Sequence, residues 1–254
     1  MRKILFQGLV LLLFLAGGIY LLTRVDWIRL LRIDKATAQV EQKLGDLIWS
    51  QQGLEEMPKD ATHKRVDAII RRLCAANEID LKRVKLHIVE NGEVNAFALP
   101  DYHMVVYSGL LKNVKNDGEL AGVLGHELAH MELSHVMKKL GKEIGLSVLV
   151  SITTGEMGGD AIKEVIGMLS SSAYDRKLEK DADVQAVKYL KNAGIDRNDF
   201  ANFLDRLGKE EAGVPKELSW LSTHPDSRER ARYIRGWRDE GRGMREKGRG
   251  RSDK

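Results

Sequence analysis

The sequence predicts an α+β fold: a mainly helical domain with one small antiparallel sheet, preceded by an N-terminal membrane helix. Three features predict it. A run of 19 uncharged residues, Ile4 to Leu22, lies near the start of the chain. Apolar residues at helical spacing occupy most of the sequence that follows. Between about residues 84 and 107 the pattern changes to the two-residue alternation of strands, which places a single sheet within a helical domain.

Residues 1–24 are predicted to be a membrane anchor or a signal segment. At ~1.5 Å per residue, the uncharged run comes close to the ~30 Å apolar core of a bilayer. Arg2 and Lys3 precede it and favour a cytoplasmic N-terminus, with the rest of the chain exported. The stretch "LFLAGG" resembles the end of a cleaved signal peptide, whereas the apolar "IYLL" after it favours an uncleaved anchor. A lipoprotein signal is excluded, because Gly18 stands where the lipidated cysteine would be needed.

Two helical segments follow. Residues 25–56 are predicted to form an amphipathic helical linker, and the pattern of "HKRVDAIIRRLCAANEI" predicts a second helix over 63–79. This helix contains Cys74, the only cysteine, so the chain can form no intramolecular disulfide. We interpret Cys74 as a small buried hydrophobic residue rather than a catalytic thiol.

The sheet is predicted from strands at about 84–90, 93–99 and 103–107, arranged as an antiparallel meander. The pair Asn91-Gly92 lies between the first two strands, and Asn-Gly between alternating runs is a strong hairpin signal. Pro100 and Asp101 form the second turn.

The rest of the chain is predicted to be helical. The first helix runs from about 117 to 140, with Asn116 as N-cap, Glu119 as its capping-box partner and Gly141 at the exit. The apolar stretch 144–152 is too short to cross a bilayer and is predicted to be a buried helix. A loop at the glycines 155, 158 and 159 precedes the helical segment "SSSAYDRKLEKDADVQAVKYLKNAG", and the last helices lie near 198–210 and 226–239.

Residues 57–240 therefore form the predicted globular domain, and residues 241–254 a basic, Gly-rich and disordered tail. The net charge of the chain is +4, and much of this surplus lies in the tail. No aromatic residues are interleaved with the tail's basic residues, so no nucleic-acid partner is expected.

A metal site is predicted from "HELAH" within the first long helix. His126 and His130 are one turn apart and point to one side, so both imidazoles can reach one ion. Glu127 lies beside them and can take a proton from water at the metal. His135 lies nine residues after His126, or ~180° around a continuous helix, and is set aside as a helix-end residue or an outer contact.

Catalytic zinc uses three protein ligands, so a third must come from elsewhere. Glu179 in "RKLEKDADVQAV" is the best candidate, because small Ala182 and Ala186 let its helix approach closely. Asp183 lies one turn later and can accept a hydrogen bond from the far N–H of a ligand histidine. The alternative is an ordinary acidic, solvated helix face.

Four motifs together resemble the M48 family of zinc metallopeptidases, which includes the membrane CAAX-prenyl proteases and the HtpX quality-control protease. They are "NAFALPDYHMVVYSGLL", "GHELAHMELSH", "YDRKLEKDADVQAV" and "STHPDSRERA". The resemblance covers about residues 60–240. It implies a mainly helical, zincin-like metallopeptidase domain of the gluzincin type. Unlike the multi-pass relatives, this sequence has only one membrane segment, which puts prenyl-peptide processing in doubt.

The resemblance also implies roles for individual residues. One zinc ion per chain would bind His126, His130 and Glu179, with Glu127 as base and Asp183 in the outer shell. His224 and Arg230 match late family positions near the catalytic centre, where each can stabilise an oxyanion, and His224 can also cover the zinc at rest. The segment Asn95, Ala96, Phe97 and Ala98 would be the edge strand that pairs with an extended substrate.

We therefore expect a zinc-dependent endopeptidase, held at the inner membrane with its catalytic domain in the periplasm, or secreted there if the N-terminus is cleaved. By family analogy, its substrates are misfolded or unassembled envelope proteins. The alternatives are a non-proteolytic, chaperone-like zinc protein, an autoinhibited peptidase of the same fold, and a helical membrane-anchored domain without metal.

Overall fold

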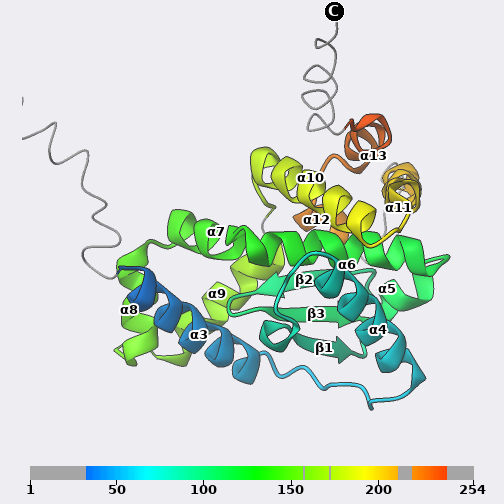
Figure 1. The fold of residues 1–254 in the computed structure, drawn as a ribbon. Coiled ribbons are helices and arrows are strands. Elements are labelled where there is room, and N and C mark those ends of the chain that lie inside the picture. The colour runs from blue at the N-terminus through cyan, green and yellow to red at the C-terminus, as the bar shows by residue number, and fades with distance from the viewer. Residues whose placement is uncertain (1–32, 157, 172, 211–218, 239–254) are drawn as a thin grey trace, which may run out of the picture.

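The fold is seen in a computed structural model that describes residues 33–156, 158–171, 173–210 and 219–238 (Figure 1). The predicted membrane or signal segment and the basic tail lie outside these residues. Within the described part of the chain, no helix is both long enough and apolar enough to cross a membrane. The fold is mainly helical with one three-stranded sheet, as predicted.

The sheet is mixed, and the predicted antiparallel meander is wrong. Its strands are β1 (Lys85–Val89), β2 (Ala96–Leu99) and β3 (His103–Tyr107), in the order β1-β3-β2. β1 pairs with β3 in parallel, and β2 pairs with β3 in antiparallel fashion. β3 is therefore the central strand, and β2 lies at an edge of the sheet.

The Asn91-Gly92 pair does not form a hairpin, because its loop is held by the start of the helix α5 (Ser108–Asn113). The carbonyl of Asn91 accepts hydrogen bonds from the Ser108 hydroxyl (3.0 Å) and from the Gly109 N–H (2.8 Å). A Cβ at Gly109 would lie 2.3 Å from the Gly92 carbonyl oxygen, so the loop packs tightly there. These contacts lead the chain past the end of β3, so that β2 pairs with β3 on the side opposite β1.

Helices cover both faces of the sheet. Side chains alternate along a strand, so His87, His103 and Phe97 share one face, whereas Met104 and Ala98 share the other. Trp49 of α3 (Ile33–Gln51) stacks on His87, which places α3 on the first face. The helix α6 (Asp117–Glu132) packs against β2, and α4 (Ala61–Ala76) packs against α6. Between them lies an aliphatic core that includes the fully buried Cys74.

The helix α6 runs between the sheet and a second group of helices (Figure 1). This group is α10 (Arg176–Asn192), α11 (Arg197–Glu210), α12 (Ser219–Thr223) and α13 (Ser227–Gly236). Small residues allow the close packing. A Cβ at Gly122 would lie 2.3 Å from Cβ of Phe200 on α11, and Gly125 faces Ala186 on α10. The predicted close approach of the Glu179 helix is confirmed.

The predicted continuous helix from 117 to 140 is wrong at its end. Its start is confirmed, because the Asn116 side chain accepts a hydrogen bond from the Glu119 N–H at 2.8 Å. However, α6 stops at Glu132, Ser134 adopts a left-handed conformation (φ 53°), and a new helix, α7 (His135–Glu143), begins. Leu133 and Ser134 separate the two helices and change the direction of the chain between them.

Two further α-helices pack against α3. The short apolar stretch forms the predicted helix, α8 (Leu146–Thr154), but the helix is only partly buried: Leu149 and Ile152 face the interior, whereas Val150 is 41% exposed. Gly155 caps its C-terminal end, and the chain continues into α9 (Gly159–Ser171), a helix that was not predicted from the sequence. α8 and α9 both pack against α3. A 3-10 turn, Leu81–Arg83, connects α4 to β1.

Candidate metal centre

The helix α6 brings His126, Glu127 and His130 into the interior. All three side chains are 0% exposed, and the two histidine Nε2 atoms lie 3.0 Å apart. This arrangement follows from the four-residue spacing on a helix that is buried between the sheet and α10. Histidine and glutamate are rarely buried without partners, so the burial itself requires a role for them.

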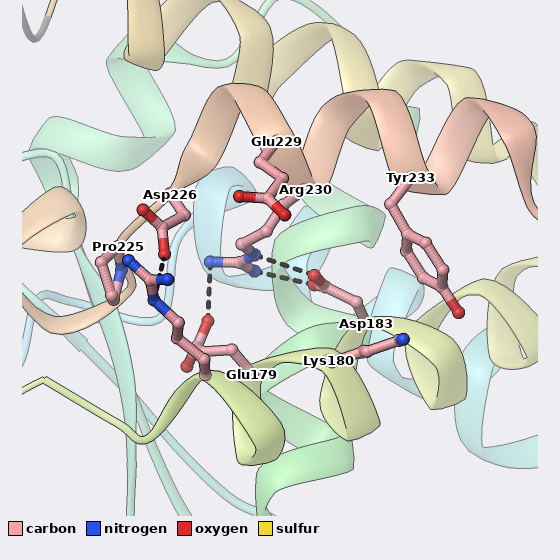
Figure 2. A pocket seen from close by; sticks show the side chains of 9 residues that line it. Glu179, Lys180, Asp183, Pro225, Asp226, Glu229, Arg230 and Tyr233 are labelled. Atoms are coloured by element: carbon pink, nitrogen blue, oxygen red, sulfur yellow. Dashed lines mark hydrogen bonds and ion pairs between the residues drawn. The ribbon is translucent and has the colours of Figure 1, made fainter.

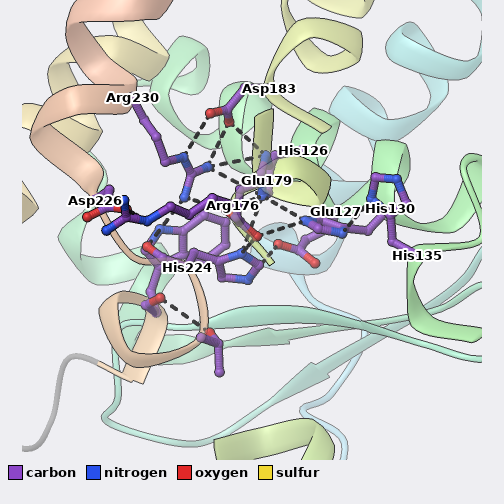
Figure 3. Close-up of polar contacts among 12 residues, drawn as sticks. His126, Glu127, His130, His135, Arg176, Glu179, Asp183, His224, Asp226 and Arg230 are labelled. Atoms are coloured by element: carbon purple, nitrogen blue, oxygen red, sulfur yellow. Dashed lines mark hydrogen bonds and ion pairs between the residues drawn. The ribbon is translucent and has the colours of Figure 1, made fainter. Parts of the chain in front are cut away.

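Glu179 reaches these histidines from the first turn of α10. Its carboxylate oxygens lie 3.5 Å from Nε2 of His126 and 3.4 Å from Nε2 of His130 (Figure 3). The carboxylate is 3% exposed. Sequence spacing and small neighbouring residues predicted this contact across 49 residues, and the structure brings the three side chains together.

His224 completes the cluster from the turn between α12 and α13. Its Nδ1 lies 2.8 Å from Glu179 Oε1 and 3.4 Å from His126 Nε2. One donor atom from each of His126, His130, Glu179 and His224 lies within 4.8 Å of the others, so the four form a group able to hold a metal.

The donor set fits zinc. Ligands about 2.0–2.1 Å from a tetrahedral ion lie about 3.3–3.4 Å apart, and the spacings between the Nε2 and carboxylate atoms fall around that value. Imidazole nitrogen and carboxylate oxygen are the donors of gluzincin-type zinc sites. Beside them, neither carboxylate oxygen of Glu127 nor Nε2 of His224 meets a hydrogen-bond partner among the described residues. Such polar atoms at full burial indicate a site built for a ligand.

Asp183 and Arg230 support the cluster from behind. Asp183 Oδ1 lies 3.0 Å from Nδ1 of His126, on the opposite side of the ring from Nε2. Arg230 donates from Nε and Nη2 to the two oxygens of Asp183, and its Nη1 lies 2.7 Å from Glu179 Oε2. The guanidinium is thus committed to two carboxylates, and its short distances to them orient both.

The electrostatics of the cluster favour a bound cation. Burial alone lowers the pKa of His126, but the Glu179 and Asp183 carboxylates raise it to about 9. Burial also opposes the ionisation of Glu179, yet His224 and Arg230 hold its pKa well below the usual range. Glu179 therefore stays ionised, as a metal ligand must.

The pKa values of Glu127 and His224 are shifted in opposite directions. Burial raises the pKa of Glu127 to about 8, whereas burial lowers the pKa of His224 to about 4. Oε1 of Glu127 lies 3.6 Å from Nε2 of His224. The Glu127 carboxyl and the His224 imidazole therefore face each other inside the cluster with pKa values displaced by burial in opposite directions.

The predicted substrate strand lies alongside this carboxyl. Ala96, Phe97 and Ala98 belong to β2, and Asn95 directly precedes it, with its carbonyl accepting a hydrogen bond from the Tyr107 N–H. The Ala98 N–H is close enough to Glu127 to lower its pKa, although the contact lacks standard hydrogen-bond geometry. Among the residues that the structure describes, no strand pairs with the outer edge of β2.

A hollow of about 200 Å³ lies between α10 and α13, outside the cluster (Figure 2). Glu179, Asp183 and Arg230 line it, so it reaches the rear of the predicted zinc ligand. An exposed ion pair between Arg176 and Asp226, 2.9 Å apart, also borders the hollow.

Three aromatic or imidazole side chains near the cluster were not given a site role from the sequence. The ring centre of Tyr174 lies 4.1 Å from that of His130, and Trp220 stacks on His224 at 4.1 Å. The four-residue spacing of Trp220 and His224 was the signal for this stack. His135 is not part of the four-residue group, in agreement with its exclusion from the ligands. The argument from a continuous helix was wrong, because α6 ends before His135 and Nδ1 of His135 lies 3.1 Å from Nδ1 of His130.

Comparison with known proteins shows a match between the model of peptidase family M48 and residues 60–238. The mitochondrial metalloendopeptidase OMA1 of Schizosaccharomyces pombe is 26% identical over 245 residues, which cover 92% of this chain and 73% of that protein. The metalloprotease LoiP of Escherichia coli is 30% identical over 200 residues, covering 73% of this chain and 77% of LoiP. A putative beta-barrel assembly-enhancing protease of Vibrio cholerae is 30% identical over 187 residues, 66% of this chain and 38% of the relative.

Proposed function

The chain is a metalloendopeptidase of peptidase family M48, and we propose that it cleaves misfolded or unassembled proteins of the bacterial cell envelope. The observation that carries the catalytic part of this proposal is the buried group His126, His130, Glu179 and His224 beside the free carboxyl of Glu127. Together these residues supply metal donors and a base within one cluster.

We propose that His126, His130 and Glu179 hold one zinc ion. When bound, zinc polarises a peptide carbonyl and makes water a nucleophile near neutral pH. Glu127 takes the proton of the attacking water, because its buried carboxyl lies beside the proposed ligands and neither of its oxygens has a hydrogen-bond partner among the described residues. The same carboxyl then gives the proton to the leaving amine.

His224 is the better placed of the two predicted oxyanion donors. Its Nε2 lies 3.6 Å from Glu127 and has no hydrogen-bond partner in the described part of the chain. Arg230 instead binds Asp183 and Glu179, so we propose that it orients His126 and Glu179 through these carboxylates.

We further propose that an extended segment of substrate pairs with the outer edge of β2 from Asn95 to Ala98. Backbone hydrogen bonds give such binding little dependence on sequence, because every residue except proline offers the same N–H and C=O groups. Unfolded chains can adopt this extended form, whereas folded proteins have their backbone groups already paired. This mode of binding supports misfolded proteins as substrates.

The proposed location rests on the first residues of the chain. The uncharged run from Ile4 to Leu22, with Arg2 and Lys3 before it, supports a membrane anchor with the catalytic domain on the periplasmic side. If the run is a cleaved signal instead, the domain is released into the periplasm. The name of the Vibrio cholerae relative, a beta-barrel assembly-enhancing protease, agrees with an envelope role.

The replacement Glu127→Gln tests the mechanism. It removes the base and keeps the size of the side chain, so we expect cleavage of an unfolded protein to fall by at least about 10²-fold. Zinc content, measured by atomic absorption, should stay at one ion per chain because Glu127 is not a proposed ligand.

Glu132→Gln is the matched control, since it makes the same chemical change on the same helix. Glu132 accepts a hydrogen bond from the Tyr102 hydroxyl at 2.7 Å, and a glutamine oxygen can still accept it. This variant should keep wild-type cleavage. Persistence of wild-type cleavage in Glu127→Gln would rule out the mechanism.

A further inference from the structure

His130 and His135 form a buried imidazole pair on the side of His130 that faces away from Glu179. Their Nδ1 atoms lie 3.1 Å apart, and the rings meet edge to face with centres 5.0 Å apart. His135 is 1% exposed, so water does not compete for this contact. The pair joins the end of α6 to the first residue of α7.

With zinc on Nε2 of His130, as proposed above, the contact between the two Nδ1 atoms fixes which nitrogen carries each proton. Nε2 of His130 lies among Nε2 of His126 and the carboxylate of Glu179, where it acts as a lone-pair donor to a metal. A neutral imidazole that uses Nε2 in this way carries its hydrogen on Nδ1. The Nδ1–H of His130 therefore donates to Nδ1 of His135, which in turn must be unprotonated there.

We propose that His135 is a positioning residue for the metal centre: it accepts the Nδ1–H of His130 and thereby holds His130 in the tautomer and ring orientation that bind zinc. The inference rests on the proposed zinc role of His130. It gives both ligand histidines an outer partner, because Asp183 lies in the equivalent place beside Nδ1 of His126. Such partners commonly change metal affinity or activity by about 10- to 100-fold.

The break between α6 and α7 makes this contact possible. In a continuous helix, residues five apart differ by ~140° around the axis, so His135 would point away from His130. The left-handed Ser134 ends the helix and swings His135 back. A left-handed conformation is unfavourable for a residue with a side chain, so the rest of the fold must compensate for the turn.

The test compares two replacements of nearly equal shape. His135→Asn keeps an acceptor oxygen near the position of Nδ1, whereas His135→Leu removes the acceptor and adds no polar group. We measure the zinc dissociation constant of the full chain by competition with a chromophoric chelator. We expect His135→Leu to weaken zinc binding by about 10- to 100-fold and His135→Asn to restore most of the loss.

His87→Leu serves as control, because His87 is also a buried histidine in a hydrogen-bonded pair but lies on the sheet face beneath α3. It should bind zinc as the wild type does. The inference is overturned if His135→Leu binds zinc within twofold of the wild type, or if His87→Leu loses as much affinity. A wild-type chain that binds no zinc would instead overturn the proposed function.

Nitrogen-15 NMR of the zinc-loaded chain gives a readout that a purely structural role would not change. We expect a slowly exchanging Nδ1–H on His130 in the wild type and in His135→Asn. In His135→Leu this proton should exchange faster, because its acceptor is gone. Equal exchange in all three proteins would contradict the assignment.

Discussion

Two carboxylates one turn apart on α10 have different partners. Glu179 faces the Nε2 atoms of both ligand histidines, whereas Asp183 faces the opposite side of His126. Arg230 contacts both, and its charge lowers the pKa of both buried acids, together with His224 in the case of Glu179. The sequence placed both acids on one helix face, but it could not show that Arg230 would bind them, since that contact spans 47 residues.

His224 is the residue whose position has the clearest consequence for activity. It supplies a fourth donor, and a catalytic zinc site must leave one position for water. Its Nε2 is also the free nitrogen proposed above to stabilise the oxyanion, so we predict that His224→Ala lowers kcat for an unfolded substrate by about 10²- to 10³-fold with KM nearly unchanged. Initial rates at saturating zinc give the value.

The opposite result would decide for the other role of His224. If it mainly fills the open metal position at rest, His224→Ala should instead raise kcat/KM by about tenfold, because that position would no longer be filled for most of the time. His63→Ala is a suitable control, because His63 is a partly exposed histidine on α4, remote in sequence from the cluster.

At the scale of elements, helices were more predictable than the sheet. Burial of one face gives each helix a periodic pattern, and the cap at Asn116 marks the start of α6 directly. Strand pairing depends instead on contacts between distant residues, such as Ser108 with Asn91, which local alternation does not reveal. The same holds for the helix break at Ser134, where no glycine or proline announces the turn.

The parallel pairing of β1 and β3 also creates a chain of polar contacts whose two central imidazoles are buried. Lys85 donates to Nε2 of His103 (3.0 Å), and Nδ1 of His103 lies 2.9 Å from Nε2 of His87. Nδ1 of His87 donates to Glu56. Lysine can only donate and a carboxylate can only accept, so the direction of the whole chain is fixed and both imidazoles are neutral.

This series of polar contacts predicts that the folded protein loses stability in mild acid. Burial, together with the charge of Lys85, lowers the pKa of His103 to about 4, although Asp46 opposes the shift. Burial likewise lowers the pKa of His87, against the effect of Glu56. Below the ordinary histidine pKa of about 6.5, the unfolded chain binds protons that the folded chain does not. The free energy of unfolding should therefore fall as pH drops from about 6.5 to 4, by roughly 2–3 kcal/mol from His103.

Urea unfolding at pH 7.5 and pH 4.5 measures this loss. The pKa values of other buried histidines are also shifted, lowered for His87 and His135 but raised for His126, so the informative quantity is the difference between the wild type and His103→Gln. Glutamine can accept from Lys85 and donate to His87 but does not titrate. The acid-induced loss should be smaller in this variant, and an equal loss in both proteins would show that His103 does not contribute.

At the scale of the whole molecule, the metal centre joins segments that are distant in sequence. α6 supplies His126 and His130, α10 supplies Glu179, and the turn after α12 supplies His224 (Figure 3). The sheet, α3 and α4 contribute no donor to this group. The "HELAH" motif could be interpreted from sequence because its two histidines need only local helical geometry. The remaining donors depended on how α10 and α13 pack on α6.

Because some elements supply metal donors and others supply none, removal of zinc should affect parts of the molecule differently. A ligand that binds only the folded state stabilises it by about 2.7 kcal/mol at 100 times its dissociation constant and by about 4.1 kcal/mol at 1,000 times. Treatment with a chelator should therefore lower the unfolding temperature and abolish cleavage, and added zinc should restore both.

Because the donors lie on α6, α10 and the α12–α13 turn, amide hydrogen exchange should accelerate mainly in α10 and α13, with β1 and β3 little affected. Glu127→Gln should show the same stability change as the wild type, since Glu127 is a base and not a proposed ligand. Uniform acceleration across the sheet and all helices would instead mean that the metal stabilises the fold as one unit, and unchanged exchange in α10 would exclude Glu179 as a zinc ligand.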